Sequence, residues 1–523
     1  MSQESVRRMG GRAARRNART SALPSSLKPV NPGLESGRYL PLLEHELETI
    51  HEQVLRVLEE IGLADAIPSC IKVMTDQGCK MSDKGRLLIP RKVVEQTLER
   101  SKKQLTLHGQ NPEHDMDLTG SRIHFGTAGA AVHIIESTSR NYRDSTLNDL
   151  YDLARLCDKL EHIHFFQRPI VCRDLEDPRE LDLNTCLASV LGTSKHVGTS
   201  FVDPIHVEET LKMLHIIAGS EEAWRARPFV SMSNCFVVPP LKFAQDACKC
   251  LEAGVYGGMP ILLLSAGQAG ATAPATIAGT VVQAVAEVLA GLVYVNALSP
   301  GASAIFGTWP FVSDLRTGAM SGGSGEQAIL MAACAQMGRY YNLPTGIAAG
   351  MTDSKLPDAQ AGYEKGYTVT LAAHSGANLI YESAGMHASL LGCSPESYVI
   401  DNDMLGAINR TVRGIEVNEN TLAFNSIKQV CIEGPGHYLG HEQTLSRMQS
   451  DYLYPELGDR ENINNWIDQG SLNIEERATK RIREILDSHF PSHISPEIET
   501  KIWDQFPALL DKGASKIKHP QFN

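Results

Sequence analysis

The sequence predicts an α/β protein built on a (β/α)8 TIM barrel, with an N-terminal helical and small α+β cap and a C-terminal helical extension. From residue 121 onward, eight short β-rich runs alternate with segments of helical pattern. The runs are almost continuously apolar, as in a parallel sheet covered on both faces. We therefore expect a basic N-terminal arm (1–38), a cap region (39–120), the barrel (121–412) and a C-terminal extension (413–523).

The eight expected strands follow one another in a regular order. They are the runs "RIHFGTA", "HIHFFQRPI", "KHVGTSF", "PFVSMSNC", "PILLLSA", "ASAIFGT", "PTGIAAG" and "NLIYESAG". Asp177, Asp203 and Ser324 begin helical patterns between them, since their side chains accept hydrogen bonds from free helix N–H groups. The alternative is a doubly wound open sheet. No GxGxxG follows the first strand, and "SGGSGEQ" lacks the Lys-Ser/Thr of a nucleotide P-loop, so dinucleotide binding is disfavoured.

Composition limits the class of protein. The chain has 523 residues, 42% of them hydrophobic and 21% charged, which is ordinary globular usage and allows a large core. Its net charge of -12 argues against general nucleic-acid binding. The opening "VRRMGGRAARRNART" is basic. We expect a solvated arm or one that packs on a neighbouring subunit, with RNA or anionic-lipid contact as the alternative.

The apolar stretch from Thr276 to Leu298 is long enough to span a membrane. It contains Gln283, Glu287 and Asn296 and has no basic flank, so we expect a buried helix and no membrane contact. Its many small residues suit close packing in a barrel wall or between subunits. Self-association into a homo-oligomer is therefore an expectation.

Eleven cysteines are scattered without a CxxC pair, which favours a reducing, cytoplasmic location. His437 and His441 stand four apart and would share one helix face, as a metal pair does. No third ligand accompanies them and there is no HExxH. We therefore expect structural histidines and no directly bound metal.

Reactive groups of this fold gather where strands end, because the following loops converge over the barrel mouth. Residues of this kind are Phe125, Arg168, Asn234, Gln268, Trp309 and Glu382, and the loop "GMTDSKLPDAQ" after the seventh strand adds Asp353 and Lys355.

Each of these residues has two interpretations. Glu382 is either a buried carboxylate that faces a cationic ligand or the structural partner of Arg168. Asp353 either faces the ligand or caps its loop. Trp309 either offers an aromatic face to an ammonium group, worth about 0.5 to 2 kcal/mol, or only packs. Lys355 would be a Schiff-base nucleophile if it were desolvated, which makes an aldolase or lyase the alternative enzyme.

Several segments resemble the trimethylamine methyltransferase family of corrinoid-dependent methyltransferases, which includes glycine betaine methyltransferases. They are "GGRAARR", "ATIAGTVVQAVAEVLAGLVYVN", "MTDSKLPDAQAGYE", "GPGHYLGHEQTL" and "YPELGDR". The resemblance implies a (β/α)8 barrel that passes a methyl group from a methylated amine to Co(I) of a separate corrinoid protein. Family members that demethylate trimethylamine carry pyrrolysine in the loop matching residues 351–358. Here Leu356 stands nearest that position, which favours a quaternary amine such as glycine betaine.

On this interpretation the corrinoid is the only cofactor, and a partner protein carries it. We expect Asp353 and Glu382 to be catalytic. The predicted substrate-binding residues are Trp309, Gln268, Asn234, Phe125, Arg168 and Leu356. A quaternary nitrogen needs an electron-rich cage, while an Arg or the "SGGSGEQ" helix start suits a betaine carboxylate. A third possibility is a non-enzymatic amine-binding protein.

Overall fold

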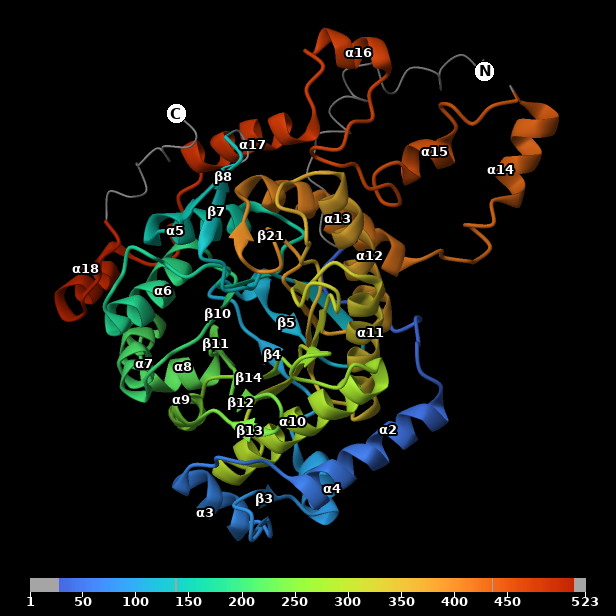
Figure 1. Cartoon of the computed structure of the whole chain (residues 1–523). Helices are drawn as coiled ribbons and strands as arrows, with labels where there is room; N and C mark the ends of the chain where they lie inside the picture. Colours follow the sequence, from blue (N-terminus) through green and yellow to red (C-terminus); the bar gives the residue numbers. More distant parts are fainter. Residues whose placement is uncertain (1–27, 137–138, 435, 512–523) are drawn as a thin grey trace.

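Eight parallel strands form a closed barrel in the structure, a computed structural model that describes residues 28–136, 139–434 and 436–511 (Figure 1). Each strand pairs in parallel with the next, and the ring closes through a parallel bridge between Gly126 and Phe165. The prediction of a (β/α)8 barrel with eight strands is confirmed. The strands are β6 (Arg122–Phe125), β9 (Phe165–Gln167), β10 (His196–Thr199), β11 (Val230–Asn234), β14 (Ile261–Ser265), β16 (Ala304–Thr308), β19 (Thr345–Ala348) and β20 (Leu379–Tyr381).

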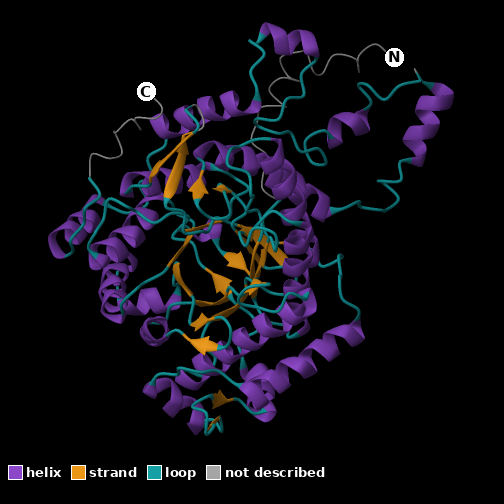
Figure 2. Ribbon diagram, viewed as in Figure 1, coloured by secondary structure: helices purple, strands orange, loops and turns teal. Residues whose placement is uncertain are grey.

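Helices surround this ring (Figure 2). Asp177, Asp203 and Ser324 cap three of them, as expected, by accepting hydrogen bonds from backbone N–H groups of the first turn. The outer helices are α5 (Leu147–Lys159), α6 (Pro178–Gly192), α7 (Pro204–Ala218), α8 (Glu221–Ala226), α9 (Gln245–Tyr256), α10 (Ile277–Leu298), α11 (Gly325–Tyr340), α12 (Ala359–Ser375) and α13 (Pro395–Arg413).

Helix α10 is long and apolar enough to cross a membrane by length and composition, yet 83% of its most apolar window is buried within the protein. The N-terminal helices α2 (Glu44–Arg56), α3 (Pro68–Asp76) and α4 (Arg91–Arg100) cover it. The carboxyl group of Glu287 accepts hydrogen bonds from Ser265, Gln283 and the Leu241 N–H. A buried barrel helix therefore accounts for this stretch.

The rest of the N-terminal region closes one end of the barrel. The strands β4 (Thr106–Leu107) and β5 (Met116–Asp117) flank the short helix η4 (Pro112–His114) at the amino ends of the barrel strands. There the His108 carbonyl lies 2.8 Å from the His196 ring, and the Asp117 carbonyl lies 3.1 Å from the His124 ring. Also in this region are β1 (Leu34–Glu35), η3 (Val57–Ile61), β2 (Lys80–Met81) and β3 (Leu87–Leu88). Residues 1–27 of the predicted basic N-terminal arm (1–38) lie outside the described residues.

Loops at the carboxyl ends of the strands fold into small sheets of their own. One sheet has the order β21-β22-β7-β8, a second β15-β17-β18, and a third pairs β12 with β13. These are β7 (His133–Glu136), β8 (Asn141–Asp144), β12 (Val237–Val238), β13 (Lys242–Phe243), β15 (Gln268–Ala269), β17 (Phe311–Ser313), β18 (Met320–Ser321), β21 (Met386–His387) and β22 (Gly392–Cys393). The rim is therefore a set of paired loops.

After the barrel the chain first leaves the body and then returns to it. Helix α17 (Ile474–Ser488) packs on α13 and α5, and α18 (Pro496–Gln505) packs on α7. Between them and α13 lie α14 (Phe424–Lys428), η5 (Gln429–Glu433), α15 (Glu442–Arg447) and α16 (Ile463–Asp468), which stand beside the barrel in Figure 1. His441 caps α15, and His437 precedes that helix, so the two do not share a helix face.

Candidate active site

Three aromatic rings meet inside the barrel: one from the first residue of β9, one from the last residue of β20 and one from the residue that follows β16. The ring of Tyr381 on β20 lies with its centroid 4.9 Å from that of Phe165 on β9 and 4.9 Å from that of Trp309, which follows β16. All three side chains are buried. The Trp309 indole N–H donates to the Gly346 carbonyl at 3.1 Å, which fixes its ring. The cluster is a rigid aromatic surface inside the barrel.

Two glycines make room for these rings. A Cβ atom on Gly346 would stand 2.8 Å from the Tyr381 ring and close to side chains of Leu262 and Ile305, so this position faces the barrel interior. A Cβ on Gly126 would stand 2.3 Å from the Phe165 ring. Only a residue without a side chain allows the backbone to approach the aromatic cluster this closely.

Glu382 follows Tyr381 directly and is 1% exposed. Its Oε2 atom has no hydrogen-bond partner among the described residues, and burial raises the pKa of its carboxyl group to about 8. The residue has a φ of 60°, in the left-handed region. Because this conformation breaks the strand alternation, the side chain need not lie opposite Tyr381. Glu382 is thus a buried acid without a basic neighbour to stabilise its charge.

Arg168, at the end of β9, does not supply that neighbour. Its Nε donates to the Ser200 hydroxyl at 2.9 Å, and no carboxylate of the described chain lies within ion-pair distance of its guanidinium. Burial lowers the pKa of Arg168 from its ordinary value. The structural pairing of Glu382 with Arg168 is therefore not formed. Arg168 therefore has no carboxylate partner, and Glu382 has no basic partner, among the described residues.

Asp353 connects three rim loops. Its carboxylate accepts hydrogen bonds from the Ser321 hydroxyl at 2.7 Å, the Gly322 N–H at 2.8 Å and the Ser389 hydroxyl at 2.5 Å. Its own N–H donates to Glu364 of α12 at 2.8 Å. The loops after β16, β19 and β20 are held together by this one side chain. Its contacts match the loop-capping interpretation, and they engage one N–H of the "SGGSGEQ" segment.

The neighbours of Asp353 in the same loop are less enclosed. Lys355 is exposed, and its ammonium group donates to the Asp353 carbonyl at 2.6 Å. Leu356 is half-buried. A Schiff-base lysine needs a desolvated amine, which this position does not offer.

The remaining predicted site residues lie in different surroundings. Phe125 is fully buried on β6 and packs against the His164 ring at 5.6 Å. Asn234 donates to the Ala247 carbonyl of α9 at 2.9 Å, so its amide meets the helix behind the strand. Gln268 is half-buried on β15, where its carbonyl accepts three backbone N–H groups of the following turn. Of the predicted residues, Trp309 contacts the Tyr381 ring and Glu382 follows Tyr381 in the chain.

Sequence reasoning missed Phe165, Tyr381 and Gln167. Gln167 is 5% exposed, and its amide lies against Gly198 of the neighbouring strand, where a Cβ would overlap it. The sequence did indicate that these residues lie in strands, because "FFQR" and "IYES" belong to two of the expected strands. Buried parallel strands are apolar on both faces, so the sequence does not show which residues face inward.

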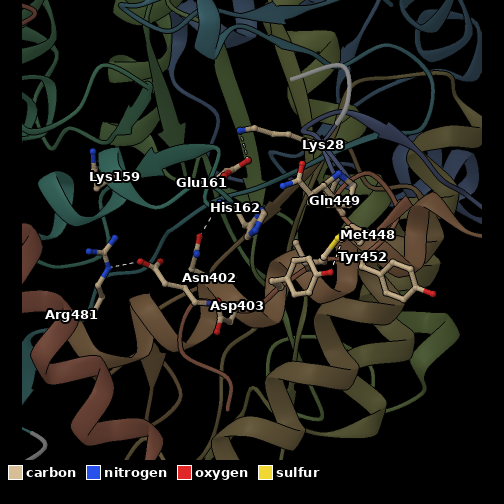
Figure 3. A pocket seen from close by; sticks show the side chains of 15 residues that line it. Lys28, Lys159, Glu161, His162, Asn402, Asp403, Met448, Gln449, Tyr452 and Arg481 are labelled. Carbon is tan, nitrogen blue, oxygen red and sulfur yellow. Dashed lines mark hydrogen bonds and ion pairs between the residues drawn. The ribbon is translucent and has the colours of Figure 1, made fainter. Parts of the chain in front are cut away.

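A separate cavity of about 800 Å³ lies away from the strand ends (Figure 3). It is bounded by the end of α5, by α13 and by the C-terminal extension. His162, whose N–H donates to Asn402 at 2.9 Å, precedes β9 at the opposite end of that strand from Arg168. This cavity is not part of the aromatic site.

Comparison with known proteins places the chain. The family model for trimethylamine methyltransferase (MTTB) matches residues 8–507. The chain belongs to the trimethylamine methyltransferase family. The resemblance of its segments to this family of methyltransferases is confirmed.

Two relatives in this family come from Desulfitobacterium hafniense. The trimethylamine methyltransferase MttB is 32% identical over 456 residues, covering 87% of this chain and 91% of the relative. The glycine betaine methyltransferase is 30% identical over 472 residues, covering 89% and 96%. A solved structure of the Methanosarcina barkeri monomethylamine methyltransferase (MtmB) aligns over 87% of this chain and 95% of its own, with 11% identity and a TM-score of 0.45.

The close approach of Gly346 to the Tyr381 ring gives a testable prediction. We expect Gly346→Ala to lower the free energy of unfolding by about 1 to 3 kcal/mol, because the added methyl group would press on the Tyr381 ring. The matched control is Gly366→Ala in α12, where nothing lies within 4 Å and the helix gains about 0.5 to 1 kcal/mol. Urea unfolding measures both. Equal effects of the two substitutions would contradict the packing described here.

Proposed function

We propose that the chain transfers a methyl group from a methylated amine, with a quaternary amine such as glycine betaine favoured, to Co(I) of a corrinoid carried by a separate protein. Two observations carry this proposal: the buried aromatic cluster of Phe165, Tyr381 and Trp309, and the buried carboxyl group of Glu382, the residue that follows Tyr381, whose Oε2 has no hydrogen-bond partner among the described residues. A permanently positive ligand would supply the opposite charge that Glu382 lacks. Trimethylamine is the second candidate substrate, supported by the relatives of that name.

A quaternary ammonium group suits a site made of aromatic rings and a buried carboxyl group for two reasons. It has no N–H to donate, so it needs no hydrogen-bond acceptors, and its spread charge interacts with aromatic faces by about 0.5 to 2 kcal/mol. A buried carboxylate is stabilised by an opposite charge within a few ångströms. Glu382 would therefore ionise when the ligand enters, and the site would prefer a cation to a neutral molecule of the same shape.

The proposed methyl transfer needs no general acid or base from the protein. The electron pair of Co(I) attacks the methyl carbon, the Co–C bond forms, and the C–N bond breaks with its electron pair going to nitrogen. The leaving group is a neutral tertiary amine, so no general acid is needed. The residues of this chain would orient one N–CH3 group toward the cobalt and exclude water. Asp353 would help to position these residues by holding the loops after β16, β19 and β20 together.

Arg168 would bind the carboxylate end of a betaine. Its guanidinium lies at the end of β9, three residues after Phe165, and carries a charge that no carboxylate in the described part of the chain neutralises. Arginine offers a planar pair of donors that fits a carboxylate. A ligand with a cationic head and a carboxylate tail would then satisfy Glu382 and Arg168 together. Choline and trimethylamine would satisfy only the first.

The two alternative functions have less support. The exposure of Lys355 removes the desolvated amine that an aldolase or lyase would need there. A non-enzymatic betaine-binding protein would use the same aromatic cluster, and only a transfer assay separates it from the enzyme. A cytoplasmic location is part of the proposal, supported by eleven free cysteines in the structure.

The deciding experiment mixes the purified chain, a Co(I) corrinoid protein and glycine betaine. We expect methyl-Co(III) in the visible spectrum and dimethylglycine in equal amount. Betaine binding measured by calorimetry without transfer would identify a binding protein. Neither binding nor transfer across betaines, carnitine, choline and trimethylamine would refute the proposal.

The charge of Glu382 has a direct test. We expect Glu382→Gln to weaken glycine betaine binding about tenfold or more, since 1.4 kcal/mol corresponds to a factor of ten. The control ligand is the carbon analogue of betaine, in which a neutral tert-butyl group replaces trimethylammonium. Its affinity should not fall in the variant. A similar loss for both ligands in calorimetry would mean that the substitution damages the pocket and not the charge interaction.

The pH dependence of binding follows from the raised pKa. At pH 7 a carboxyl group with a pKa of about 8 is mostly protonated in the free protein, and a bound cation favours its ionised form. Betaine binding at pH 7 should therefore release close to one proton, and affinity should rise with pH until it levels off above about pH 8. Calorimetry in buffers of different ionisation enthalpy measures the release. It should vanish in Glu382→Gln.

The role of Arg168 predicts a change in substrate preference. Arg168→Gln should raise KM for glycine betaine about tenfold or more while leaving KM for choline within about twofold, because only betaine carries a carboxylate. Steady-state methyl transfer to the corrinoid protein measures both. If both substrates lost activity equally, Arg168 would be structural.

A further inference from the structure

Gln167, the last residue of β9, carries its amide into the interior of the barrel. Its side chain lies on the same face of the strand as that of Phe165, because side chains two residues apart in a strand share a face. The Phe165 ring contacts the Tyr381 ring inside the barrel. Gln167 therefore also faces the interior, roughly 7 Å nearer the carboxyl ends of the strands than Phe165.

The neighbouring strands leave room for this side chain. Gly198 of β10 pairs with Gln167, and a Cβ atom at Gly198 would overlap the Oε1 atom of Gln167 and stand 2.7 Å from its Cδ. The amide thus occupies the space that a side chain at position 198 would fill. Ser231 of β11 pairs with Gly198 in turn, and its hydroxyl lies 2.9 Å from the His196 ring. Small residues therefore form the barrel wall beside the amide.

The amide of Gln167 has no hydrogen-bond partner among the described residues, although the side chain is buried. The Thr127 hydroxyl donates to the backbone carbonyl of Gln167 at 2.6 Å, which leaves the side chain unengaged. A buried amide is costly without a partner, and most buried polar groups have one. A ligand that enters the site displaces water from this amide and must replace the hydrogen bonds that water makes.

We propose that Gln167 is a specificity-determining residue whose amide hydrogen-bonds an oxygen atom of the substrate. This role rests on the proposed function and narrows its substrate class to methylated amines that carry a carboxylate or hydroxyl group. A quaternary nitrogen bears only carbon atoms, so the oxygen atom is the part of the ligand that the amide can bind. A site built to hydrogen-bond a substrate rejects the analogue that lacks the bonding group, because its own polar group is then left unpaired. Tetramethylammonium is such an analogue.

Gln167 and Arg168 would recognise different features of the substrate. The guanidinium group of Arg168 is charged and suits a carboxylate. The neutral amide of Gln167 donates to a carboxylate or a hydroxyl and also accepts from a hydroxyl. Choline, which has a hydroxyl but no carboxylate, should therefore depend on Gln167 and not on Arg168.

Calorimetry on the purified chain, without a corrinoid protein, tests this role. Gln167→Met keeps the length of the side chain and removes the amide. We expect it to weaken the binding of glycine betaine and of choline about tenfold or more, and to leave the affinity for tetramethylammonium within about twofold. An equal loss for all three ligands, or no loss for any, would overturn the proposal. If the natural chain bound none of the three, the proposed function would fail as well.

Gly198→Ala reaches the same amide from the neighbouring strand. Its added methyl group would overlap the amide of Gln167 and turn it away, so the same selective loss of glycine betaine and choline is expected. In the double variant with Gln167→Met, Gly198→Ala should cause no further loss, because the amide is already absent. Gly366→Ala is the control and should leave the binding of all three ligands unchanged, since nothing lies within 4 Å of its added methyl group. Additive losses in the double variant would show two independent effects and overturn the proposal.

Discussion

Burial of an unmatched carboxyl group is the constraint on which the proposed site depends. A charge in a low-dielectric interior is costly unless an opposite charge compensates it, and the group otherwise takes up a proton. Glu382 is buried and follows Tyr381 of the aromatic cluster in the chain, and its Oε2 has no hydrogen-bond partner in the part of the chain that the structure describes. The closed barrel keeps the Glu382 carboxyl group away from water. A cationic ligand would make the ionised form of this carboxyl group favourable.

The backbone of the barrel makes room for the aromatic rings of the proposed site. Gly346 and Gly126 bring main chain up to the faces of Tyr381 and Phe165, where any side chain would displace the rings. The Trp309 indole is fixed by its hydrogen bond to the Gly346 carbonyl. Through Gly346, strand β19 therefore leaves space for the Tyr381 ring and orients the Trp309 ring. Because these rings are fixed before a ligand binds, the ordering cost of binding would be low.

Much of the fold was predictable from the sequence, because alternating apolar strands and capped helices have local signals. Asp177, Asp203 and Ser324 cap the helices that the sequence assigned to them. The expected positions of Trp309 and Glu382 just after their strands are also confirmed, since the position of a residue after a strand is visible in sequence.

The orientation of side chains was not predictable in the same way. Asn234 ends its strand as expected, yet its amide meets α9, while Phe165 and Tyr381 face inward from runs that look uniformly apolar. The left-handed backbone of Glu382 also has no local sequence signal, because Glu is not a residue that favours φ above zero. The sequence left open whether Asp353 faces a ligand or caps its loop, and in the structure three hydrogen bonds from two other loops engage its carboxylate. Tertiary contacts decide such cases.

The molecule divides its surfaces among distinct tasks, and the division follows from how the chain enters and leaves the barrel. The N-terminal region occupies the amino ends of the strands, where the His108 and Asp117 carbonyls meet barrel histidines. That end is closed to a ligand. The carboxyl ends carry loops paired into small sheets and held together by Asp353, so the rim is ordered but built from connections that can differ without disturbing the barrel. In the proposed function, the protein that carries the corrinoid would approach the site from this end.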